Sequence, residues 1–210
     1  MIAKAPAAGH AKTRLSPPLS PAQAAELAEA ALCDTLEAVL QTSATRRVLV
    51  LDGPAGDWLP PGIEVIAQRP VGFAERLAGA FEDVGGTAFL IGMDTPQVTP
   101  RMLDSALEAL GAPANDAVLG LCEDGGYWGI GLRRADARVF AEIPMSTERT
   151  GECQRLRLEA LGLRTGTLPV LRDVDRHADA LAVARQAPSG RFARALARAS
   201  GRSTTAQEAA

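Results

Sequence analysis

The feature that most constrains the fold is a short apolar segment that ends abruptly in a carboxylate. Residues 88–93 are all apolar or glycine, and they are followed by Asp94 and, two residues later, Pro96. An uninterrupted apolar run of this length is typical of a parallel strand that is buried on both faces. Pro96 ends the strand, and Thr99 with Pro100 supplies the N-cap and first residue of a helix. The sequence therefore predicts a strand-to-helix crossover with Asp94 at the carboxyl end of the strand.

The position of Asp94 suggests a role in ligand binding. In open α/β sheets, ligands bind in the crevice beyond the carboxyl ends of the strands. The simpler interpretation is that Asp94 only caps the turn before Pro96, and for an isolated Asp-x-Pro this is the better explanation. Other segments of the chain change that balance.

Length and composition indicate one ordinary globular domain. The 210 residues suffice for one good-sized core and are few for two. A net charge of −3 without a long run of one sign gives no indication of nucleic-acid or membrane-surface binding. Since no long apolar segment or signal-peptide pattern is present, we expect a cytoplasmic protein, and a homodimer is compatible with the sequence. The spacing of Cys33, Cys122 and Cys153 predicts neither a disulfide framework nor a zinc site.

A basic loop follows the first few residues of the chain. Residues 1–4 have the character of the end of a strand. The charged, polar and turn-forming residues that follow are Lys4, Pro6, Gly9, His10, Lys12, Thr13 and Arg14. Cationic side chains around a glycine-containing loop are expected where a polyphosphate binds. A solvated basic loop explains these residues equally well, because the loop lacks the Walker A pattern.

Strand and helix patterns alternate through the rest of the chain. Besides 88–93, strands are expected at 47–52, 63–68, 116–122 and 165–171. Helices are expected at 20–42, which opens with a capping box, and at 72–81, 99–110 and 148–161, with one more after residue 175. These elements suit the open α/β sheet inferred around Asp94.

A second acidic segment, residues 123–128, combines two acidic residues, two glycines and two aromatic residues. Asp124, Gly125 and Gly126 suit a sharp turn that presents the carboxylate and lets a ligand approach the backbone closely. A plain hairpin turn explains them equally well. The adjacent Tyr127 and Trp128, two of only eight aromatic residues, favour a ligand site.

A third acidic segment follows the expected strand at 165–171. If its Asp173-Val-Asp175 run lies near the end of the Asp94 strand, Asp94 and one of these aspartates can converge on a divalent cation. Hard carboxylate oxygens suit magnesium or manganese. The alternative is that Asp175 caps the last helix, and a capping role is likewise the default for Ser146.

Together these segments resemble the DUF2064 family, whose members are similar to the nucleotide-diphospho-sugar transferases with a GT-A fold. The matching segments are 3–6 with Gly9, 12–15, 75–77, 80–81, 91–96, 123–127, 130–132, 146–147 and 171–175. The resemblance covers about residues 1–185 and implies a single three-layer α/β/α domain with a mostly parallel mixed sheet. We therefore expect a GT-A-like transferase domain at 1–188, followed at 189–210 by a helix and a disordered tail that begins at Ser203.

The resemblance also implies roles for individual residues. Nucleotide contacts are expected from Lys4, Pro6, Gly9, Lys12, Thr13, Arg14, Gln68, Glu75 and Arg76. Acceptor contacts are expected from Asp124, Gly125, Gly126, Tyr127, Ser146 and Thr147. Asp94 and Asp175 are the expected ligands of Mg²⁺ or Mn²⁺, and Lys12, Arg14, Asp94 and Asp124 the residues expected to act in the reaction.

Two reactions fit these residues, and the fold alone does not choose between them. In nucleotidylyl transfer, a phosphate or phosphonate acceptor attacks an NTP and expels pyrophosphate, which needs cations and a metal but little general base. In glycosyl transfer, an acceptor hydroxyl attacks an NDP-sugar, and Asp124 is then the candidate base. Three basic residues within eleven favour nucleotidylyl transfer to a small-molecule acceptor, although the family's naming favours sugar transfer. A nucleotide-binding protein without turnover is a third alternative.

Overall fold

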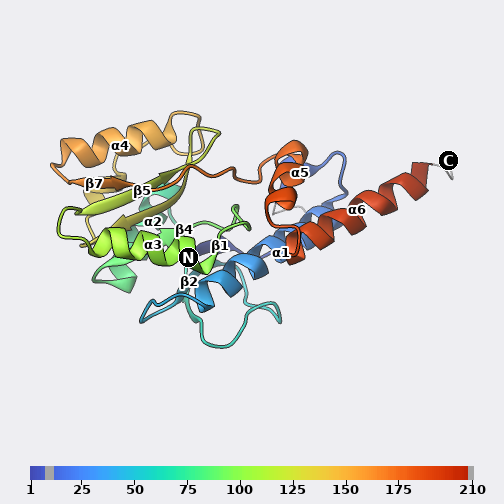
Figure 1. The fold of residues 1–210 in the computed structure, drawn as a ribbon, viewed down its shortest axis with the longest axis horizontal. Helices are drawn as coiled ribbons and strands as arrows, with labels where there is room; N and C mark the ends of the chain where they lie inside the picture. The colour runs from blue at the N-terminus through green and yellow to red at the C-terminus, as the bar shows by residue number, and fades with distance from the viewer. Residues whose placement is uncertain (8–11, 208–210) are drawn as a thin grey trace.

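The computed structural model describes residues 1–7 and 12–207, in which strands and helices alternate for most of the chain (Figure 1). The strands are β1 (Ile2–Lys4), β2 (Val48–Asp52), β3 (Glu64–Ala67), β4 (Ala88–Ile91), β5 (Ala117–Leu121), β6 (Tyr127–Leu132) and β7 (Thr165–Thr167). The α-helices are α1 (Pro21–Leu40), α2 (Phe73–Val84), α3 (Pro100–Gly111), α4 (Thr150–Ala160), α5 (His177–Gln186) and α6 (Arg191–Gln207). Two 3-10 turns, η1 (Thr13–Leu15) and η2 (Ala137–Phe140), complete these elements.

Backbone hydrogen bonds join the strands in the orders β1-β2-β3 and β4-β6-β5-β7. The first sheet is parallel, and in the second only β6 runs against its neighbours. The mixed, mostly parallel α/β arrangement is thus confirmed, with one difference from the single sheet expected. β1 is three residues long and bonds to β2, while its Ile2 belongs to the same apolar core as Leu90 of β4. The two sheets are therefore joined by apolar packing at this boundary.

The central strands are buried on both faces, as the apolar run at 88–93 predicted. Leu90 packs in the core on one side of the sheets and Ile91 in the core on the other, at 8% and 3% exposure. Alternate side chains of a strand point to opposite faces, so two consecutive buried residues require a covering layer on each face. The sequence of β4 therefore predicts a fold of three layers, with the sheet between two covering layers.

Helices supply those two covering layers. Leu77 and Phe81 of α2 and Leu158 of α4 pack on one face, where the Phe81 and Phe140 rings stack with centroids 5.6 Å apart. Helices α1 and α3 cover the other face, and α3 contributes Leu110. Figure 1 shows α3 and α4 on opposite sides of the strands. Burial of these side chains is the main favourable term for the fold.

The C-terminal helices pack against α1 and beside the cleft described below. Phe192 and Leu196 of α6 share a core cluster with Leu27 of α1 and Val183 of α5. Figure 1 shows α6 beside α1 and α5. The Asp34 carboxylate accepts hydrogen bonds from two backbone amides at the start of α6, which anchors that end to α1. Helix α6 continues to Gln207, past the Ser203 at which a tail is expected, and the division of the chain at residue 188 stays a prediction. Across residues 1–7 and 12–207, every helix is too short or too polar to cross a membrane.

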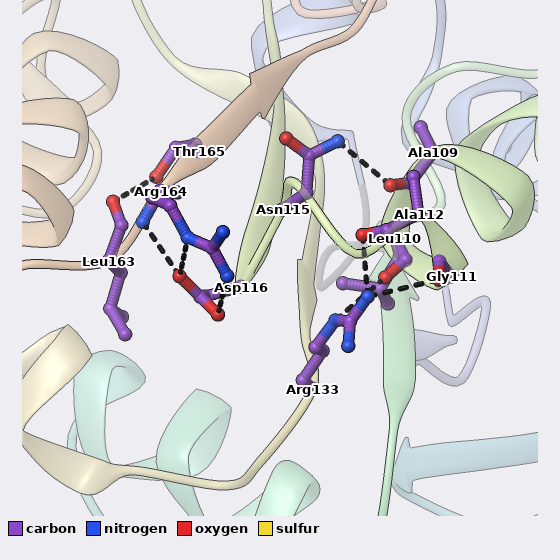
Figure 2. Close-up of polar contacts among 10 residues, drawn as sticks. All are labelled: Ala109, Leu110, Gly111, Ala112, Asn115, Asp116, Arg133, Leu163, Arg164 and Thr165. Atoms are coloured by element: carbon purple, nitrogen blue, oxygen red, sulfur yellow. Dashed lines mark hydrogen bonds and ion pairs between the residues drawn. The ribbon is translucent and has the colours of Figure 1, made fainter.

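The amino end of β5 is held by a group of side chains that we call the amino-end clamp: Asn115, Asp116, Arg133 and Arg164. The Arg164 guanidinium donates to both Asp116 carboxylate oxygens, at 2.8 and 3.0 Å, which ties β5 to β7 (Figure 2). Arg133 donates to the last carbonyls of α3, and Asn115 donates to Ala109 at 2.8 Å. These contacts satisfy groups that a helix end leaves without intrahelical partners. Hydrogen bonds from Arg164 lower the pKa of Asp116 to about 2.

Candidate active site

A cleft with two lobes opens where the strands carry their carboxyl ends. One lobe, of about 390 Å³, is lined by cationic and amide side chains, and we call it the basic lobe. The other, of about 590 Å³, is lined by carboxylates and aromatic rings, and we call it the acidic lobe. Asp94, Asp175 and Arg14 line both lobes. The structure thus places the residue that ends the buried β4 segment at the junction of the two lobes.

Asp94 joins β4 to the third acidic segment. Its backbone carbonyl accepts a hydrogen bond from the Val174 amide at 2.8 Å. Its carboxylate lies 2.5 Å from the ammonium of Lys12, which also donates to the Val174 carbonyl. The Lys12 side chain is 8% exposed, so this cation is held between the two segments rather than in solvent. The convergence of Asp94 with the segment 173–175 is the arrangement that the sequence predicted.

Asp175 pairs with Arg14, and their charged atoms lie 2.6 Å apart. The N-cap of α5 is Arg176, whose amide donates to the Asp179 carboxylate at 2.9 Å. The alternative role of Asp175 as the helix cap is therefore wrong. Its carboxylate faces both lobes.

Asp173 was missed by the sequence-based selection of site residues. It lines the acidic lobe, and burial together with the nearby carboxylates of Asp124, Asp175 and Asp94 raises its pKa to about 6. A signal for it was present, because Val174 is fully buried and its two flanking aspartates then share the opposite side of an extended segment. Four aspartates from three segments thus gather around the cleft.

The turn after β5 holds Asp124 rigidly. The Gly126 amide donates to one Asp124 carboxylate oxygen at 2.7 Å. Gly125 has φ +90°, and an added Cβ would lie 1.9 Å from the Glu148 carbonyl oxygen, so only glycine fits there. Tyr127 lines the acidic lobe, and burial raises the pKa of its hydroxyl, which has no hydrogen-bond partner among the residues described.

In the basic lobe, Gln68 lines the cleft and also binds the backbone of β1 and β2. Its amide nitrogen donates to the carbonyls of Ala3 and Val50, and its oxygen accepts from Arg76 at 3.0 Å. The Arg76 guanidinium also lies 5.3 Å from the centre of the Phe73 ring. Gln68 therefore fixes the position of Arg76 at the ends of β1 and β2. Lys4 is exposed and lines the same lobe.

The remaining predicted site residues are placed as follows. Ser146 lines both lobes and Thr147 the acidic lobe, where Thr147 also donates to the Pro144 carbonyl. Pro6 and Glu75 line neither lobe, and Gly125 contributes its carbonyl to Gly151 instead of a surface to the cleft. Thr13 begins η1. Gly9 and His10 lie outside the described residues.

Two residues of the cleft have a backbone conformation that favours glycine. Lys12 has φ +52° and Ser146 has φ +61°, and of the described non-glycine residues only Glu142 is also in this region. A left-handed conformation costs a non-glycine residue about 1 kcal/mol or more, and such residues concentrate at functional sites. The observation supports a functional role for this cleft.

Comparison with known proteins identifies the family. A family model described as "Uncharacterized protein conserved in bacteria (DUF2064)" matches residues 26–147. The chain belongs to this family. No curated protein sequence matches the DUF2064 chain.

Solved structures confirm the fold of this DUF2064 protein. A candidate nucleotide-diphospho-sugar transferase from Desulfovibrio desulfuricans G20 is 27% identical, with a TM-score of 0.74 over 83% of this chain and 81% of that one. CMP:2-keto-3-deoxy-manno-octonic acid synthetase in complex with CTP is 15% identical, with a TM-score of 0.57 over 90% and 98%. The mannosyltransferase PcManGT from Pyrobaculum calidifontis, in complex with GDP-Man and Mn²⁺, is 14% identical, with a TM-score of 0.53 over 93% and 63%. At such identities the last two show a shared fold alone.

Proposed function

We propose that this DUF2064 protein is a metal-dependent transferase that uses a nucleotide substrate. The proposal rests on the charged groups at the junction of the two lobes. Lys12 pairs with Asp94 and Arg14 pairs with Asp175, and Asp173 lies near both aspartates. Such a junction provides carboxylates for a cation and cations for phosphates within one cleft. The same fold binds CTP in one relative and GDP-Man in another, which agrees with this assignment.

The donor set fits a hard divalent cation. Asp94, Asp173 and Asp175 offer carboxylate oxygens, which are the ligands that Mg²⁺ and Mn²⁺ prefer. Burial, and after it the neighbouring carboxylates, raise the pKa of Asp173, and a cation between the carboxylates would relieve their repulsion. We assign Asp94 and Asp175 as its ligands. When bound, the ion would neutralise charge on the phosphates of the nucleotide.

The basic lobe is the proposed nucleotide site. Lys4, Lys12, Arg14 and Arg76 line it, and three of them already lie beside carboxylates. Charge-assisted hydrogen bonds from such groups are the strongest that proteins make to phosphates. We therefore place the phosphates beside Lys12 and Arg14, and the nucleoside toward Phe73 and Lys4.

The acidic lobe favours glycosyl transfer over nucleotidylyl transfer. Asp124, Glu148 and Asp173 line it together with Tyr127 and Trp128. A phosphorylated acceptor would be repelled by these carboxylates, whereas sugar hydroxyls donate hydrogen bonds to carboxylates and pack on aromatic rings.

In the proposed reaction, Asp124 acts as the general base. One of its oxygens is held by the Gly126 amide, which leaves the other to take the proton of an acceptor hydroxyl. That hydroxyl oxygen forms a bond to the anomeric carbon of the NDP-sugar as the bond to the diphosphate breaks. Lys12 and Arg14 stabilise the negative charge on the leaving nucleoside diphosphate.

Nucleotidylyl transfer is the second candidate, because four cations in the basic lobe suit a triphosphate. The test is a pair of assays with Mg²⁺ or Mn²⁺. One measures nucleoside diphosphate released from NDP-sugars in the presence of hydroxyl acceptors. The other measures pyrophosphate released from NTPs in the presence of phosphorylated acceptors. We expect diphosphate release that Asp124→Asn abolishes while nucleotide affinity, measured by calorimetry, persists. Pyrophosphate release would establish the second candidate. Nucleotide binding without either product would establish a binding protein.

A further inference from the structure

Cys122 lies beside the carboxylates of the acidic lobe, on a rigid piece of backbone. Its amide donates to the Gly126 carbonyl at 2.9 Å, and a parallel bridge pairs it with Leu171. The turn to Asp124 and the segment to Asp173 both leave from this bridge. The backbone near all three residues is therefore held by the same hydrogen bonds.

The three side chains form a compact group of potential metal ligands. The Cys122 Sγ atom and one carboxylate oxygen each of Asp124 and Asp173 all lie within 4.8 Å of one another. Cys122 is only 7% exposed, yet it lines the acidic lobe. Within the part of the chain that the structure describes, no hydrogen bond is found for its thiol. Free cysteine is often buried as a small apolar side chain, but the Cys122 sulfur also has two carboxylates within 4.8 Å and lines the cleft.

We propose that Cys122, Asp124 and Asp173 form a binding site for a thiophilic divalent cation such as Zn²⁺, Co²⁺ or Cd²⁺. Zinc takes cysteine sulfur at about 2.3 Å and carboxylate oxygen at about 2.0–2.2 Å, so its ligand atoms end less than about 4 Å apart in a tetrahedral site. The group needs to contract by only about 1 Å to reach this geometry. Three protein ligands leave the fourth position open toward the cleft.

This site differs in chemistry from the hard-cation set of Asp94 and Asp175, and an ion bound there would occupy Asp124, the proposed general base. Magnesium prefers oxygen ligands and does not use a thiol, whereas a thiolate selects soft or borderline ions. On binding, the sulfur forms a bond to the metal and the thiol proton passes to solvent. No local pattern in the sequence indicates the site, because its ligands belong to no Cys-x-x-Cys pattern and come from segments about 50 residues apart.

The test uses Co²⁺ as the probe, because a thiolate bound to Co²⁺ gives a ligand-to-metal absorption band. We expect the full chain to show this band on titration with Co²⁺, with about one proton released per ion, and Zn²⁺ to abolish it. Cys122→Ser should lose the band. The matched variants Cys33→Ser and Cys153→Ser, which alter the other two free cysteines, should keep it.

Two further variants separate this site from the proposed transferase. Asp173→Asn should weaken Co²⁺ binding at least tenfold, and it serves as the test should Cys122→Ser fail to fold. Asp94→Asn should keep the band, whatever its effect on turnover. Absence of the band in the wild-type protein, or its persistence in Cys122→Ser, would overturn the proposal, and neither result depends on the transferase activity.

Discussion

The aspartates at the two ends of β5 have different partners and opposite pKa shifts. Asp116, at the amino end, is paired with Arg164 through both oxygens, and its pKa falls to about 2 (Figure 2). Asp173, near the carboxyl end, is partly buried among other carboxylates, and burial together with these charges raises its pKa to about 6. At the amino end, the opposite charges pair with each other and hold β5 to β7. The carboxyl end keeps a surplus of negative charge, which is the property that a cation site requires.

Hydrogen bonding and backbone conformation also differ between the two ends. At the amino-end clamp, Arg133 and Asn115 satisfy carbonyls at the end of α3. At the cleft, Lys12 and Ser146 occupy left-handed conformations, and the Tyr127 hydroxyl is buried without a partner among the described residues. Stability and site chemistry therefore belong to different ends of one sheet. Variants at the two ends should separate them.

The largest effect is expected for Asp94→Asn. Loss of this carboxylate should lower metal-dependent turnover at least about 100-fold, the scale seen when one group that stabilises transition-state charge is removed. The melting temperature should fall only modestly, because the buried Lys12 ammonium keeps its hydrogen bond to the Val174 carbonyl and Asn still offers it an acceptor oxygen. Steady-state kinetics and thermal unfolding measure the two quantities. Full turnover in this variant would remove Asp94 from the site.

Arg14→Ala should weaken nucleotide binding about tenfold, because the residue supplies a charge-assisted hydrogen bond to phosphate. Titration calorimetry with a nucleoside diphosphate measures the affinity. Arg101→Ala is the matched control, since this arginine is exposed on α3 and lines neither lobe. Equal affinities of the two variants would show that the basic lobe does not hold the phosphates.

At the other end, Asp116→Asn should lower thermal stability and leave turnover per folded molecule unchanged. The folded-state pKa of Asp116 lies below its ordinary value of 3.8, at about 2. Its stabilising effect is therefore complete above about pH 4 and is lost as the pH falls toward 2. Wild type and variant should differ in melting temperature at pH 7 and converge near pH 2. Asp57→Asn, at an exposed position, is the control and should show no such convergence.

The smallest effect is expected for Ser146→Gly. Relief of the left-handed conformation contributes about 1 kcal/mol, and the greater chain entropy of glycine offsets most of it, so the melting temperature should barely move. Turnover should fall a few-fold, because a side chain that lines both lobes is lost. Glu142→Gly changes a residue with the same φ of 61° outside the cleft. If it lowers turnover equally, strain at Ser146 has no special role.

Local patterns predicted much of the scaffold. The burial of Leu90 and Ile91, the capping box of Ser20 and Gln23, and the helix after Thr99 were predicted from a few neighbouring residues each. The i, i+4, i+8 spacing of Phe73, Leu77 and Phe81 in the sequence predicts one apolar face on α2, and this prediction is only partly correct. Leu77 and Phe81 are buried, but Phe73 is 42% exposed and contacts the Arg76 guanidinium at the cleft. Helical spacing shows which side chains share a face, but it does not show where the covering layer ends.

The sequence by itself determined that Asp94 ends a buried strand, that a basic loop and two further acidic segments exist, and that the chain resembles its family. Only the tertiary structure decided which charges meet. Lys12 reaches Asp94, Arg14 reaches Asp175, and Asp173 joins Cys122 and Asp124 across about 50 residues. The physical reason is the range over which the two kinds of interaction act. Strand and helix preferences depend on near neighbours in the chain, whereas Coulomb interactions and metal ligation depend on distances in space that strand order and register set.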